Sequence, residues 1–119
     1  MNTREKGAQK EKEVCAYLHS EGVKIVEQNF RSRQGEIDII GYDEGYLVFF
    51  EVKYRAGLSR GSAAEAVGFS KQKRICQVAD YYRLLHHCTE DTPLRFDVVA
   101  VDQDQITWIK NAFEYIRWH

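Results

Sequence analysis

Apolar residues recur at helical spacing in two parts of the chain. Over about residues 4–20, Val14, Tyr17 and Leu18 are spaced to lie on one face of a helix. A second helical pattern runs from Ser70, which is placed to act as its N-cap, to about residue 87. The apolar stripe of this second helix comprises Ile75, Val78, Ala79, Tyr82 and Leu85.

Five shorter segments are rich in β-branched and aromatic residues, which is typical of strands. They cover residues 24–30, 37–41, 46–54, 95–101 and 106–110. The small residues of segment 56–62 predict a loop. The predicted order is therefore α-β-β-β-α-β-β, an α/β fold in which helices flank a mixed sheet. At 119 residues the chain forms one domain, residues 1–119, with a single core.

The strands at 37–41 and 46–54 form a predicted hairpin whose register follows from its side chains. A turn centred on residues 44–45 sets Ile37 opposite Val52 and Ile39 opposite Phe50, so that these residues share one apolar face. The residues at 43–45 also suit a three-residue hairpin loop. That loop would shift the register by one residue and mix charged and apolar side chains on each face, unless a bulge restored the register. The apolar register is preferred. Its polar face pairs Asp38 with Glu51 and Glu36 with Lys53.

In this register Asp38 and Glu51 are cross-strand neighbours, with Cβ atoms roughly 5 Å apart. Such close like charges repel, and either a shared proton or a divalent cation relieves the repulsion. Oxygen ligands favour a hard ion, so Mg²⁺ or Mn²⁺ is expected rather than zinc. On the same face, Lys53 could steady a phosphate oxygen or a metal-bound hydroxide. On spacing alone, salt bridges from Lys53 to Glu36 and Glu51 on a solvated face are an equally good interpretation.

The first predicted helix supplies a third acidic candidate. Glu11 precedes Val14, Cys15 and Leu18 by three, four and seven residues, so it continues the stripe expected to be buried. A carboxylate in that position needs a partner. The alternative places Glu11 near solvent at the end of the stripe, or bonded to an Arg or Tyr, and spacing alone favours this alternative.

The net charge of −1 gives no overall nucleic-acid signature, but the basic residues are clustered. They surround the acidic strands, as expected if a polyanion contacts a rim around a metal. Such contacts position a backbone without reading its sequence. For the basic residues beyond position 70, the alternative is that they lie on the solvated first turns of a helix and bind nothing. The candidate phosphate-binding residues are Arg31, Arg33, Arg55, Lys71, Lys73 and Arg74.

Several other features point to folding or location rather than to chemistry. The three cysteines lack metal or redox spacing and are expected to be reduced thiols. The charged N-terminus and the absence of an apolar run long enough to span a membrane favour a cytoplasmic protein. Asp97 is expected to be a structural acid paired with an Arg, and residues 86–88 the frayed end of a helix. The terminal aromatic residues are expected in the core or a dimer contact.

The motifs together resemble those of the YraN-like family of small bacterial proteins. The resemblance covers nearly the whole chain and rests on segments 35–38, 47–55, 61–67, 73–75, 95–98 and 111–113. That family resembles archaeal Holliday-junction resolvases and the restriction-endonuclease-like fold with its PD-(D/E)XK motif. The resemblance implies that Asp38 and Glu51 are metal ligands, that Lys53 is the catalytic lysine, and that Glu11 completes the metal site.

The function implied is a Mg²⁺- or Mn²⁺-dependent nuclease acting on phosphodiester bonds of DNA, branched DNA included. Two alternatives stay open from the sequence. One is a module of the same fold that binds nucleic acid without cutting it, and the other is RNA as the substrate. Resolvase relatives also suggest a homodimer.

Overall fold

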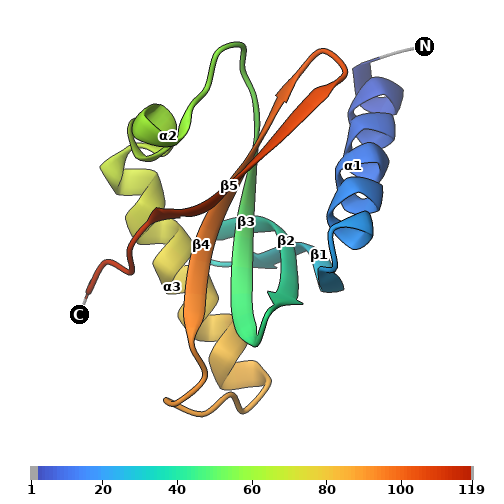
Figure 1. Cartoon of the computed structure of the whole chain (residues 1–119). Coiled ribbons are helices and arrows are strands. Elements are labelled where there is room, and N and C mark those ends of the chain that lie inside the picture. The colour runs from blue at the N-terminus through green and yellow to red at the C-terminus, as the bar shows by residue number, and fades with distance from the viewer. Residues whose placement is uncertain (1–2, 119) are drawn as a thin grey trace.

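The computed structural model describes residues 3–118, apart from the side chains at positions 3 and 60. Within these residues it contains three helices and five strands, and Figure 1 shows their arrangement. They are α1 (Thr3–Ser20), β1 (Lys24–Ser32), β2 (Gly35–Asp43), β3 (Tyr46–Tyr54), α2 (Arg60–Val67), α3 (Phe69–Leu85), β4 (Leu94–Asp102) and β5 (Gln105–Phe113). The predicted α/β class, a mixed sheet flanked by helices, is confirmed, and it is compatible with a restriction-endonuclease-like fold.

The five strands form one sheet in chain order, β1-β2-β3-β4-β5. β3 and β4 are parallel, and the other three neighbouring pairs are antiparallel. A parallel pair needs a long crossover connection, and here α2 and α3 supply it. The crossover places α3 against one face of the sheet, whereas α1 lies on the other (Figure 1).

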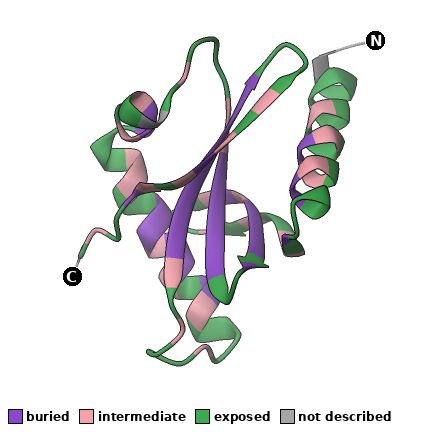
Figure 2. Cartoon of the chain, in the orientation of Figure 1, coloured by how far each residue is buried: buried purple, intermediate pink, exposed green. Residues whose placement is uncertain are grey.

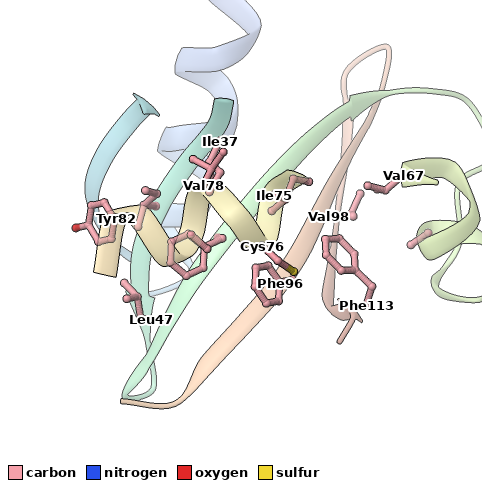
Figure 3. Packing of buried hydrophobic residues seen from close by; sticks show 14 of the residues in the cluster. Ile37, Leu47, Val67, Ile75, Cys76, Val78, Tyr82, Phe96, Val98 and Phe113 are labelled. Atoms are coloured by element: carbon pink, nitrogen blue, oxygen red, sulfur yellow. The ribbon is translucent and has the colours of Figure 1, made fainter. Parts of the chain in front are cut away.

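The central strand β3 is buried on both faces because its side chains alternate between two apolar clusters. Leu47 and Phe49 pack in the cluster that contains α3, which Figure 3 shows from close by. Val48 and Phe50 pack in the cluster that contains Val14 and Leu18 of α1. The buried parts of β2, β3 and β4 therefore form the middle of the molecule, as the purple segments of Figure 2 show.

The helix α2 was not predicted, since its sequence is rich in small residues that are typical of a loop. The backbone N–H of Ser59 donates to Oγ of Ser62 at 3.1 Å, which satisfies a group at the start of the helix. Ala63 and Val67, four residues apart, are buried in the apolar cluster between the helices α2 and α3 and the sheet. A helix of eight residues is not stable alone, so tertiary packing of this short apolar stripe stabilises it.

The structure corrects two details of α3. The helix begins at Phe69 after Gly68, so Ser70 lies inside its first turn and is not the N-cap. Leu85 is exposed rather than part of the buried stripe, because it lies in the last turn, beside the exposed His86. The rest of the predicted stripe is confirmed, and Cys76 joins it. The buried residues of α3 are Ile75, Cys76, Val78, Ala79 and Tyr82.

The predicted turn of the β2–β3 hairpin is confirmed. Glu44 and Gly45 both have positive φ, at 51° and 86°, as a two-residue hairpin turn requires. Strand pairing runs from Asp43–Tyr46 to Ile39–Phe50, the register that the apolar pattern predicts.

Beyond Ile39 the hairpin departs from regular pairing. The backbone N–H of Val52 donates to Oδ2 of Asp38 at 2.8 Å. Ile37 packs in the cluster under α3, whereas Ile39 packs in the cluster under α1. The expectation that both share one face is therefore wrong. Because the Asp38 carboxylate takes a backbone donor of the neighbouring strand, the regular alternation is interrupted at this residue.

Asp97 is the structural acid that the sequence predicts. It is fully buried and accepts hydrogen bonds from Nε and Nη2 of Arg95, from Nε1 of Trp108 and from the backbone N–H of Asn111. Nη2 of Arg95 also donates to Asp43 at 2.7 Å. Since each of these carboxylates has an ionic partner, the network ties β4 to β5 and to the end of β2 without leaving a buried charge unpaired.

The remaining expectations concern the cysteines, the C-terminal aromatics and the membrane. All three cysteines are free, and only Cys76 is fully buried. Phe113 is in the core, and the side chains of Tyr115 and Trp118 both donate to Oδ2 of Asp80 at 2.6 Å. Among residues 3–118, no helix combines the length and the apolar character needed to cross a membrane.

Candidate functional site

Asp38 lies in β2 with its carboxylate turned toward β3, where it accepts the Val52 N–H bond described above. Burial raises the pKa of this carboxyl group from 3.8 to about 6, and the negative charge of Glu51 adds to the rise. The Val52 hydrogen bond and the positive charge of Lys71 act in the opposite direction. An acid in this environment gives up its proton reluctantly, and a bound cation would make ionisation easier.

Glu51 is buried near the end of β3, and its partner is a lysine from α3. Oε1 of Glu51 lies 2.6 Å from Nζ of Lys71. The Glu51 side chain is only 7% exposed, whereas that of Lys71 is 40% exposed. A buried carboxylate requires a counter-charge, and Lys71 supplies it across the gap between helix and strand.

Lys53 follows Glu51 by two residues on β3 and is partly exposed. The proposed salt bridges to Glu36 and Glu51 are not formed. Glu36 pairs instead with Nε of Arg31 at 3.6 Å, and Glu51 pairs with Lys71. Within residues 3–118 no ion pair reaches the ammonium of Lys53. This group is therefore available for a ligand.

Glu11 is exposed on α1, so the expectation that it continues a buried stripe is wrong and the alternative near solvent is right. It nevertheless lines the same pocket as Asp38. The pocket has a volume of about 70 Å³ and also includes Cys15, Val52 and Tyr54. Since one water molecule needs about 10–15 Å³ in this measure, the pocket has room for several waters or a partly hydrated ion.

The two carboxylates that line this pocket, those of Asp38 and Glu11, offer oxygen ligands of the kind that a hard divalent cation prefers. The negative charge of Glu51 opposes the ionisation of Asp38. In the described part of the chain, however, no group of three or more His, Cys, Asp or Glu side chains is assembled closely enough to hold a metal ion. A complete ligand set would require Glu51 to exchange Lys71 for the ion, or Glu11 to turn inward.

Comparisons with known proteins place the chain in a family. A family model described as "Uncharacterised protein family UPF0102" matches residues 10–101, which include Glu11, Asp38, Glu51 and Lys53. The chain belongs to this family. Membership agrees with the resemblance to YraN-like proteins that the motifs carry.

Individual UPF0102 proteins are similar over almost their full lengths. One from Lachnoclostridium phytofermentans is 46% identical over 114 residues, which cover 96% of this chain and 97% of the relative. One from Clostridioides difficile is 44% identical, with 95% and 100% covered. One from Francisella tularensis is 39% identical, with 98% and 100% covered.

The six basic residues predicted to contact phosphate are distributed unevenly in this UPF0102 protein. Lys71 contacts the acidic pair directly, through Glu51. Arg31 and Arg33 are exposed at the β1–β2 turn, and Arg55 is exposed just beyond β3. Lys73 and Arg74 are exposed on α3. Only Lys71, among the described residues, therefore joins the acidic site itself.

The role of Lys71 as the partner of Glu51 was missed at the level of sequence. A signal was present, because Lys71, Ile75, Val78 and Tyr82 follow helical spacing. Lys71 therefore begins the stripe that faces the sheet, and its ammonium reaches the end of β3. The aromatic Tyr54, which lines the pocket beside Asp38, was also not singled out.

Proposed function

We propose that this UPF0102 protein is a metal-dependent endonuclease-like enzyme that hydrolyses phosphodiester bonds of DNA. The observation that supports the proposal is that the Asp38 carboxylate, which lines the pocket, lies close enough to Glu51 on the adjacent strand for that negative charge to raise its pKa. Two lysines accompany them, Lys71 in an ion pair and Lys53 without one among the described residues. Folding alone gives no reason to bury two acids of like charge together.

Each residue has a role in this proposal. A divalent cation held by the two carboxylates would polarise the scissile phosphate and lower the pKa of an attacking water. Lys53 orients that water or offsets the negative charge that develops on the phosphoryl group. The Val52 N–H bond fixes the direction of the Asp38 carboxylate. Glu11, on α1, offers a further carboxylate to the pocket.

The test is cleavage of four substrates, namely a four-way DNA junction, a DNA flap, a linear DNA duplex and RNA, each with Mg²⁺ or Mn²⁺. The variants are Asp38→Asn and Lys53→Met, and Lys24→Met, at an exposed position outside the predicted phosphate-binding residues, is the matched control. Wild type and the control are expected to cut at least one DNA substrate, and both site variants to lose most of that activity. Equal cleavage by all four proteins would refute the assignment of the site, and cleavage of RNA alone would replace the substrate.

A second candidate function is a module of the same fold that binds nucleic acid without cutting it. The Lys71–Glu51 ion pair favours this candidate, because it already neutralises one of the acids that a catalytic ion would need. Binding of any of the four substrates without cleavage in either metal would support the module and contradict the nuclease.

A further inference from the structure

Three hollows in the surface are linked in series by shared lining residues, and we call this series the track. The pocket beside Asp38 shares Tyr54 with a second hollow of about 250 Å³, which Lys10 and Asp102 also line. The second hollow shares Arg55 with a third of about 180 Å³, which extends to Thr107 on β5. The track therefore leads from the acidic pocket, past the end of β3, onto the β4–β5 hairpin.

Tyr54 stands where the acidic pocket meets the second hollow. It is the last residue of β3 and is 54% exposed, although a tyrosine ring more often buries most of its surface. Glu11 and Asp38 line the same pocket as Tyr54. Partial burial raises the pKa of the Tyr54 hydroxyl, and the charges of the two carboxylates raise it further. The available face of an aromatic ring beside a candidate phosphate-cleaving site is suited to stacking on a nucleobase.

The charges along the track allow only a few phosphate contacts. Arg55 is exposed and has no ion pair within the described residues. Nζ of Lys10 donates to the carbonyl of Gln103 at 2.9 Å and to Asp104 at 3.3 Å, so it joins α1 to the β4–β5 turn instead of standing free. Asp102 adds a negative charge to both outer hollows. Attraction of a polyanion here must rely more on stacking than on charge.

The recess of the acidic pocket restricts the shape of the strand that can enter. Asp38 is reached between α1 and the end of β3, and the Lys10 contacts hold α1 and the β4–β5 turn together. A duplex presents its phosphates on a stiff rod with every base stacked and paired. An unpaired strand can bend into a hollow and turn one base away from its neighbours.

We infer that this track binds single-stranded DNA, with one base stacked on Tyr54 and the adjoining phosphate directed toward Asp38. The inference rests on the proposed function, because it takes DNA as the substrate and assigns the strand form that the site accepts. Tyr54 is a specificity residue in this arrangement, and Arg55 contacts the backbone beyond it.

The test is fluorescence anisotropy of a labelled single-stranded DNA 12-mer and of the same sequence as a duplex. It is carried out with the full chain and Ca²⁺ as a divalent ion. Wild type is expected to bind the single strand more tightly. Tyr54→Ala should weaken single-strand binding by about 5- to 150-fold, the range for loss of one stacked base, whereas Tyr54→Phe should stay within about 3-fold of wild type. Arg55→Gln should reduce the salt slope of binding by about 0.7.

Thermal melting of each variant shows whether it is folded. A folded Tyr54→Ala variant that binds the single strand as wild type does would overturn the inference, as would equal affinity of wild type for strand and duplex. An equal loss with Tyr54→Phe would also overturn it, since that variant keeps the ring.

Failure of the proposed function gives a different pattern. Strand binding that depends on Tyr54, with no cleavage in Mg²⁺ or Mn²⁺, supports the track and contradicts the nuclease. Cleavage that requires Asp38, with binding indifferent to Tyr54, supports the nuclease and contradicts the track.

Discussion

Replacement of Asp38 by asparagine is expected to stabilise the folded protein above pH 7. The carboxylate is largely buried and lies near the negative charge of Glu51, and both effects oppose its ionisation. Asparagine keeps an oxygen that can accept the Val52 N–H bond, but carries no charge. The variant therefore removes the unfavourable charge and preserves the hydrogen bond.

The size of the effect follows from the pKa of Asp38, which is raised from 3.8 to about 6. Between these values the folded chain holds more protons than the unfolded chain, so the free energy of unfolding falls as the pH rises. At about 1.4 kcal/mol per pH unit, the ionised group destabilises wild type by about 3 kcal/mol at pH 8 and by less than about 1 kcal/mol at pH 4. The variant should gain these amounts, which near pH 8 correspond to a rise in Tm of about 10 °C.

The assay is urea denaturation of wild type and Asp38→Asn between pH 4 and pH 8, without divalent ions. Asp102→Asn, at an exposed position, is the matched control and should follow wild type at every pH. The difference between Asp38→Asn and wild type should grow from pH 4 to about pH 7 and then level off. A variant that is no more stable than wild type at pH 8, or a difference independent of pH, would refute the reasoning from burial and charge.

Three further predictions concern the ion pair, the metal and the sheet. Lys71→Met should lower the free energy of unfolding, measured in urea, by about 1–3 kcal/mol, because Glu51 loses its counter-charge. The double variant with Glu51→Gln should recover most of this loss. A Lys71→Met variant as stable as wild type would contradict the prediction. Mg²⁺ at ten times its Kd should stabilise wild type by about 1.4 kcal/mol in thermal melting, but not Asp38→Ala; equal responses would argue against the shared ion. Gly41→Ala should lower the free energy of unfolding in urea by about 1–3 kcal/mol, since the added Cβ would lie 2.8 Å from the carbonyl oxygen of Lys24. Gly61→Ala is the control and should not lower it, because its added Cβ would have no atom within 4 Å. Equal stability of Gly41→Ala and wild type would contradict the prediction.

Local patterns predicted most of the fold, because strand alternation and turn chemistry depend on neighbouring residues. β3 has the bounds that its composition indicates, and the Glu44–Gly45 turn fixes the hairpin register as far as Ile39. α2 could not be predicted in this way. Its helical state depends on the burial of Ala63 and Val67 against distant strands, because a helix of eight residues is not stable alone.

The sequence predicted which acidic residues form the candidate site, but not which residues they contact. Asp38 and Glu51 stood out because charges are unusual in buried strands. The partner of Glu51 did not, since Lys71 lies twenty positions along the chain on another element and any of several nearby cations could have served. For Glu11, spacing favoured the position near solvent that the structure shows, but it could not show that the side chain lines the pocket beside Asp38.

The ion pair between Lys71 and Glu51 has a consequence for how the protein folds in the absence of a ligand. In small metal-dependent domains, the ion often completes the fold, and a chelator unfolds the chain. Here the chain carries its own cation, on a helix that also supports the core through Ile75 and Val78. If the proposed ion binds here, folding is expected not to depend on its supply. The chain should then fold in a solution without magnesium, and a chelator should leave the folded structure intact.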